Sequence, residues 1–125
     1  MVRPTFLVVE AEPGNALSTR KLVLETAKFN VLTAHSWREA GELFELFPRV
    51  NAVIVSKEVG NGPGCANFIR QVKQRNPELT AIFLSPNHGR SCDGADHVIS
   101  SHEPHTLVEL VRSLFGDPRP EDTAP

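Results

Sequence analysis

Short apolar runs alternate along the chain with longer segments in which apolar residues recur every three or four positions. The first run, Thr5–Val9, is continuous and rich in β-branched residues, which is typical of a parallel strand buried on both faces. Similar runs follow at 30–34, 52–55, 80–84 and 97–99. Strands that alternate with helical segments predict an α/β fold, a doubly wound parallel sheet with helices on both faces.

The helical segments have recognisable starts. A turn signal at Pro13 opens a helix that is expected to run to about Lys28. Ser36 and Glu39 have the spacing of a capping box, and the helix after them places Ala40, Leu43, Phe44 and Phe47 on one side. Further helices are expected over 66–75 and over a last segment that contains 107–115.

The connection after the fourth strand is different from the others. Only residues 86–93 separate Ser85 from Gly94, and their Pro, Asn and Gly content is typical of a loop. We therefore expect the helix at this point to be shortened or missing.

Length and composition limit the possible functions. The 125 residues fit one domain, predicted over 1–116, followed by a Pro-rich disordered tail or linker stub over 117–125. A net charge of −2 argues against direct nucleic-acid binding through a basic face. No apolar run approaches the roughly 20 residues of a membrane span or resembles a secretory signal, so a cytoplasmic location is expected.

The two cysteines, Cys65 and Cys92, are too few for a disulfide framework and form no C-x-x-C pair. We expect both to be reduced thiols.

Functional residues of parallel sheets gather where the strands end. That rule selects Glu10, Ala11 and Glu12 after the first strand, Ser56 and Lys57 after the third, Ser85 after the fourth and Ser101 after the fifth.

These strand ends and their neighbours resemble the response-regulator receiver family over residues 5–115. Residues 8–13 resemble the family's apolar strand that ends in acidic residues followed by Glu-Pro, and residues 51–56 resemble the strand that ends at its phosphoacceptor. Gly64 matches a loop glycine of the family, and Gly94-Ala95-Asp96 resembles the tripeptide before its fifth strand. The resemblance implies a flavodoxin-like sheet of strand order 2-1-3-4-5.

The resemblance also shows that the family's chemistry is missing. A receiver uses an aspartate nucleophile, acidic ligands for Mg²⁺, a lysine that neutralises phosphoryl charge and a Thr or Ser hydroxyl. Ser56 stands at the nucleophile, Ala11 replaces one acid, and Ser101 stands at the lysine. Only Ser85 is compatible with the family, although Lys57 could supply another ammonium.

The output side departs from the family as well. Val98 occupies the position of the aromatic switch residue, and the connection at 86–93 is about two helical turns shorter than usual. The sequence thus predicts a pseudo-receiver in bacterial two-component or phosphorelay signalling. It would not be an enzyme, would need no cofactor or metal, and would bind another signalling protein or an output domain, with a homodimer possible.

Two other functions stay open. The pocket could be a small-ligand or metal-binding sensor near Glu10, Ser56 and Ser101, and His88, His102 and His105 could together ligate zinc. Alternatively, the chain could be a conventional regulator with an unusual phosphoacceptor.

Overall fold

The computed structural model describes residues 4–10, 24–56, 64–85, 92, 94–100 and 104–116. Its strands are β1 (Thr5–Val9), β2 (Asn30–Ala34), β3 (Ala52–Ser56), β4 (Thr80–Ser85) and β5 (His97–Ser100), and its helices are α2 (Trp37–Leu46), α3 (Cys65–Arg75) and α4 (Pro104–Phe115). The predicted tail at 117–125 and most of the predicted first helix lie outside the described residues. No helix in the described part has the length and hydropathy needed to cross a membrane.

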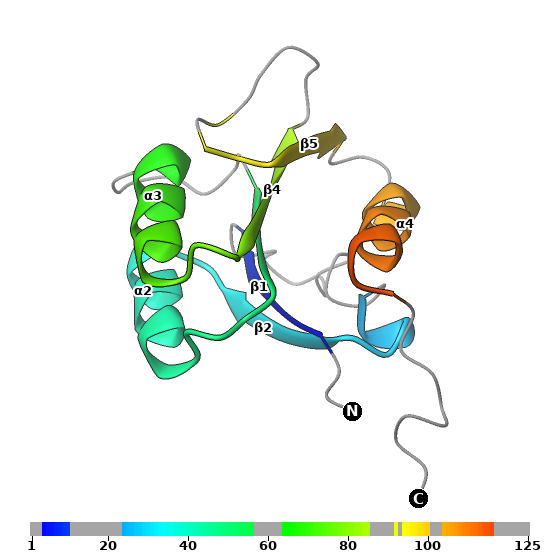
Figure 1. Ribbon diagram of the computed structural model, residues 1–125, viewed down its shortest axis with the longest axis horizontal. Coiled ribbons are helices and arrows are strands. Elements are labelled where there is room, and N and C mark those ends of the chain that lie inside the picture. Colours follow the sequence, from blue (N-terminus) through cyan, green and yellow to red (C-terminus); the bar gives the residue numbers. More distant parts are fainter. Residues whose placement is uncertain are drawn as a thin grey trace, which may run out of the picture.

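The five strands form one parallel sheet with the order β2-β1-β3-β4-β5, which confirms the predicted topology. Figure 1 shows α2 and α3 on one face of the sheet and α4 on the other. Because both faces are covered, the central strands need apolar residues away from their ends, as they have at 6–9, 52–55 and 81–84.

Side chains alternate between two core layers. Leu7, Val53 and Phe83 face α2 and α3, where the Trp37 ring lies 5.5 Å from the Phe68 ring and joins the two helices. The opposite layer contains Phe6, Ile54, Ile82 and the α4 residues Leu107 and Val111. The two-residue period of the strands therefore determines which helix each side chain meets.

The start of α2 confirms the predicted cap. The Ser36 hydroxyl accepts a hydrogen bond from the Glu39 backbone N–H at 3.0 Å, and Glu39 Oε1 accepts one from the His35 N–H at 2.7 Å. The prediction that Phe47 continues the helix on the same side as Ala40 and Phe44 was wrong. The backbone leaves the helix at Phe47 (φ −131°, ψ 65°), and the ring is exposed.

The first helix ends in a Schellman motif. Residues 24–26 are helical, the Phe29 N–H donates to the Leu24 carbonyl at 3.1 Å, and the Lys28 N–H donates to the Glu25 carbonyl at 2.9 Å. Lys28 has the left-handed φ of 75° that this motif requires. Leu24 and Phe29 belong to the same core layer, so the chain turns directly into β2.

The connection from β4 to β5 agrees with the predicted loss of a helix. Of its residues the structure describes Cys92 and Gly94 to Asp96, and none of these is helical. Val98 on β5 is 45% exposed, whereas Phe83, its partner in register on β4, is 3% exposed. The described residues thus leave this face of the edge strand without a helical cover.

Replacing Lys28 with glycine should stabilise the fold. A side chain in the left-handed region costs about 1 kcal/mol, and glycine removes that cost while adding some entropy to the unfolded chain. The free energy of unfolding of Lys28→Gly, measured by urea denaturation, should rise by about 0.5 kcal/mol. Lys28→Ala keeps the Cβ and should show no rise, and an equal gain in both variants would contradict this explanation.

Candidate functional site

The described members of the predicted site, Glu10, Ser56 and Ser85, lie along the edge of the sheet where the strands end. Val9 lies opposite Val55, Ser56 opposite Leu84, and Ser85 opposite Ser100. The register therefore brings the carboxyl ends of β1, β3, β4 and β5 to one edge, as expected for a parallel sheet.

Glu10 directly follows β1 and extends its pairing with β2. Its N–H donates to the Ala34 carbonyl at 3.0 Å, and its own carbonyl oxygen lies 3.3 Å from His35 Nδ1, within reach of a proton on that nitrogen. The residue is only 3% exposed. The backbone of the β1 end is thus fixed by β2 and by the residue that precedes the α2 cap.

Ser56 ends β3 and is 2% exposed. Its hydroxyl is neutral at neutral pH and becomes a nucleophile only beside a general base. A neutral hydroxyl is also compatible with such deep burial, because an isolated charge there would carry a large desolvation cost. The end of β3 is therefore suited to packing and hydrogen bonding.

The other predicted site residues are only partly described. The structure places Ser85 as the last residue of β4, while Ala11, Glu12, Lys57 and Ser101 lie outside the described residues. His88 and His102 also lie outside them, and His105 is exposed on α4. In the part that the structure describes, no three metal-ligating side chains gather.

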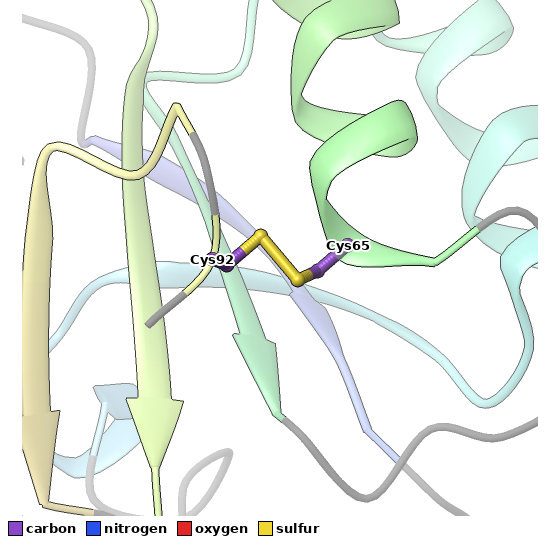
Figure 2. The surroundings of a disulfide bond; sticks show 2 residues. All are labelled: Cys65 and Cys92. Carbon is purple, nitrogen blue, oxygen red and sulfur yellow. A yellow bond between two sulfur atoms is a disulfide. The ribbon is translucent and has the colours of Figure 1, made fainter. Parts of the chain in front are cut away.

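The expectation of two reduced thiols was wrong. Figure 2 shows Cys65, the first residue of α3, joined by a disulfide to Cys92 in the β4–β5 connection. Their Cα atoms are 6.1 Å apart, within the normal range for this bond. Counting cysteines could not reveal the pair, because the fold alone brings these two connections together.

The disulfide is the first of three contacts that join α3 to Cys92 and residues 94–96. We call this set of three contacts the α3 seam. Gly94 is the second: a Cβ at this position would lie 3.2 Å from Ile69 Cγ2, and its φ is +90°. The third is the ion pair between Lys73 Nζ and Asp96 Oδ2 at 2.8 Å.

The spacing of these contacts explains how the segment runs. The α3 members Cys65, Ile69 and Lys73 recur every fourth residue and form one stripe of the helix. Their partners Cys92, Gly94 and Asp96 recur every second residue, in a turn where the Ala95 N–H donates to the Cys92 carbonyl at 3.0 Å. The segment that leads into β5 therefore lies along α3.

Asp96 makes the polar contacts of the α3 seam. Besides Lys73, its Oδ2 accepts a hydrogen bond from the Ala81 backbone N–H at 2.7 Å, which ties β4 to the start of β5. Burial raises the pKa of Asp96, but the hydrogen bonds from Lys73 and Ala81 and the charge of Lys73 outweigh it and hold the pKa below its usual value. The sequence indicated Asp96 only as part of a family pattern, and its pairing with Lys73 was missed.

Two cavities lined by described residues lie away from the buried pair Glu10 and Ser56. One, of about 580 Å³, contains Arg49, Asn51 and Leu79, residues that precede β3 and β4, and thus lies toward the amino edge of the sheet. The other, of about 520 Å³, flanks the α3 seam and contains Ile69, Lys73 and Gly94.

Comparison with solved structures shows which fold this is. The chain is similar to a receiver domain from Clostridium thermocellum (22% identity, TM-score 0.73, covering 88% of this chain and 92% of the other). A CheY-like receiver domain from Methanospirillum hungatei JF-1 gives 18% identity and a TM-score of 0.75, covering 90% and 94%. TrrA from Thermotoga maritima, solved with Mg²⁺-BeF, gives 22% and 0.71, covering 90% and 99%.

Comparison with models of protein families and with curated proteins finds no match. The chain has the receiver-domain fold of two-component response regulators. At these identities the likeness concerns the fold.

The Asp96 ion pair should make stability depend on acid pH. A lowered folded pKa contributes stability that is complete well above the ordinary carboxyl pKa of 3.8 and is lost as the pH falls through the folded value. At pH 7, Asp96→Asn should lower the free energy of unfolding by about 1 kcal/mol. The loss is no larger because both side chains are partly exposed, and water screens their attraction. The difference between variant and wild type should shrink on acidification below about pH 4.

Glu42→Gln is the matched control for this measurement. It removes a more exposed ion pair, with Arg38 at 3.7 Å on α2, and should change stability little at any pH. A loss in Asp96→Asn that stays constant down to pH 2 would contradict the role of the Asp96 charge.

Reduction of the disulfide should destabilise the chain. The bond closes a loop with a sequence separation of 27, and opening such a loop lowers the free energy of unfolding by roughly 3 kcal/mol. Urea denaturation with and without dithiothreitol measures this loss. The Cys65→Ser/Cys92→Ser variant should show no further loss with the reductant, and equal stability of oxidised and reduced wild type would contradict the estimate.

Proposed function

We propose that this chain is a pseudo-receiver, a receiver-type signalling domain that binds a partner without being phosphorylated. The observation that carries the proposal is Ser56, a buried hydroxyl at the end of β3, where the family that the sequence resembles has its phosphoacceptor aspartate. The receiver fold is kept around this position, and the reacting carboxylate is absent from it.

The nucleophile is the first missing function. An aspartate is already an anion at neutral pH, whereas a serine hydroxyl must lose its proton to a base before it can attack phosphorus. His35, the described histidine at this edge, directs Nδ1 towards the Glu10 carbonyl oxygen. That contact places the His35 imidazole at the backbone of Glu10, directly after β1.

The residues present do not fit Mg²⁺. The ion needs hard oxygen ligands in nearly octahedral geometry, usually including carboxylates. Ala11 offers no side-chain oxygen, and Ser56 offers a neutral one in place of an anion. TrrA was solved with Mg²⁺-BeF, and the same ligands would find a poorer set of donors in this chain.

The response to phosphorylation is altered too. Ser101 stands where the family's lysine would neutralise phosphoryl charge, and Val98 stands at the aromatic switch position. Valine has no polar tip that could alternate between a buried and an exposed state. In this proposal the domain is not an enzyme, uses no metal or cofactor, and transmits its signal through surface complementarity.

The partner in this proposal is another signalling protein or an output domain in the bacterial cytoplasm. The face of β5 around the exposed Val98 supports this choice, because the described part of the shortened crossover leaves it open to a partner side chain. A second copy of the chain is a further possible occupant of this face.

An NMR titration tests the loss of phosphorylation chemistry. Amide resonances of Glu10, Ser56 and Ser85 should not shift when Mg²⁺ and then beryllofluoride, a phosphoryl mimic, are added to the wild type. The Ala11→Asp/Ser56→Asp/Ser101→Lys variant restores the family's groups on the same fold and should shift saturably.

Each outcome of the titration has a meaning. A saturable shift in the wild type would show that the pocket keeps its chemistry and would refute the proposal. No response in a folded restored variant would mean that this edge differs from a receiver pocket in more than the substituted residues, and that would also count against the proposal.

A further inference from the structure

The disulfide joins the two connections that frame the candidate site. The connection that leaves Ser56 reaches α3 at Cys65, and the connection that leaves Ser85 contains Cys92 (Figure 2). Both cysteines of the chain are used in this one bond. It therefore ties the chain after β3 to the chain after β4, beside the strand ends that carry the site.

We infer that Cys65–Cys92 is a thiol–disulfide switch that sets the position of residues 92–96 on α3. Through that segment it would control the carboxyl edge of the sheet and the open face of β5 around Val98. The inference rests on the proposed function in one respect, since it takes this face as the surface that a partner recognises. Redox state would then be the input that phosphorylation supplies in a conventional receiver.

The rest of the α3 seam explains why reduction would be a local event. Without the disulfide, Gly94 still packs against Ile69, and Asp96 still holds Lys73 and the Ala81 N–H. These contacts keep the later part of the segment and the start of β5 in place. Only the Cys92 end of the seam is released.

Each cysteine also suits the reduced state. Cys92 is 5% exposed in the same core layer as Ile69 and Phe83, where a thiol packs as a small apolar side chain. Cys65 is partly buried at the first position of α3, where the positive end of the helix dipole stabilises a thiolate. Neither residue leaves an uncompensated charge in the core when the bond opens.

The exchange is balanced with a dithiol as the reductant. Its first thiolate attacks the sulfur of the more accessible Cys65, forms a mixed disulfide and expels Cys92 as a thiolate, which takes up a proton. The second thiol of the reductant then attacks the first sulfur of the same reductant molecule, which is bonded to Cys65 in the mixed disulfide. This closes the reductant's own disulfide and releases Cys65. The chain gains two electrons and two protons, and the dithiol becomes a cyclic disulfide.

The test compares the oxidised chain with the same chain in dithiothreitol, without denaturant. Iodoacetamide should then label two thiols per chain, as measured by mass. The reduction rate should rise with the dithiothreitol concentration and exceed the rate of global unfolding by more than about tenfold, because the bond is attacked in the folded state. Amide shifts should appear at Gly64, Gly94 and Ala95 and extend to Ser56 and Val98, with α2 unchanged.

The Cys65→Ser/Cys92→Ser variant is the control. Its spectrum should resemble that of the reduced wild type and should not respond to dithiothreitol. Three results on the wild type alone would overturn the inference: thiols that react only at the unfolding rate, a reduced chain that has lost its dispersed spectrum, or shifts confined to the cysteines and their direct neighbours. The first two would make the bond a purely structural crosslink.

The two proposals fail separately. Beryllofluoride binding to the oxidised wild type would refute the loss of phosphorylation chemistry and leave the redox response standing. A chain without native-state reduction would refute the switch, whatever the beryllofluoride titration shows.

Discussion

The whole structure depends on covering both faces of a five-stranded parallel sheet. Each central strand is apolar away from its ends, so each connection must return a covering element to one face before the next strand begins. Among the described residues, helical ones occur in three of the four connections: 24–26 before β2, α2 before β3 and α3 before β4. The connection before β5 has too few residues for the usual helix, and the α3 seam is what fastens it.

The seam uses three different interactions on one stripe of α3. A covalent bond at Cys65, close packing at Ile69 and an ion pair at Lys73 hold the segment before β5 along the helix. Only glycine fits the middle contact, because the backbone there has a positive φ and approaches Ile69 closely. This arrangement positions β5 and leaves Val98 45% exposed.

The fold and the chemistry of this molecule are specified by different residues. The strand order was predicted from the resemblance to receiver domains. The strands, to within one residue at their ends, and the Ser36 cap could be predicted because they depend on local sequence patterns. The Cys65–Cys92 bond and the Lys73–Asp96 pair could not, because they join residues far apart in the chain whose approach follows from the β4–β5 connection. Ser56 stands at a strand end, where a serine leaves the apolar pattern of β3 untouched, so the receiver fold is compatible with a hydroxyl at this position.

The central claim is that this fold has kept the frame of a phosphorylation site without its reaction. The most direct measurement is the intact mass of the chain after incubation with acetyl phosphate and Mg²⁺, with a phosphorylatable receiver domain in the same tube as the positive control. The account predicts that the control gains the mass of a phosphoryl group while this chain keeps its original mass. Stoichiometric addition to this chain, mapped to the carboxyl edge of the sheet, would contradict it.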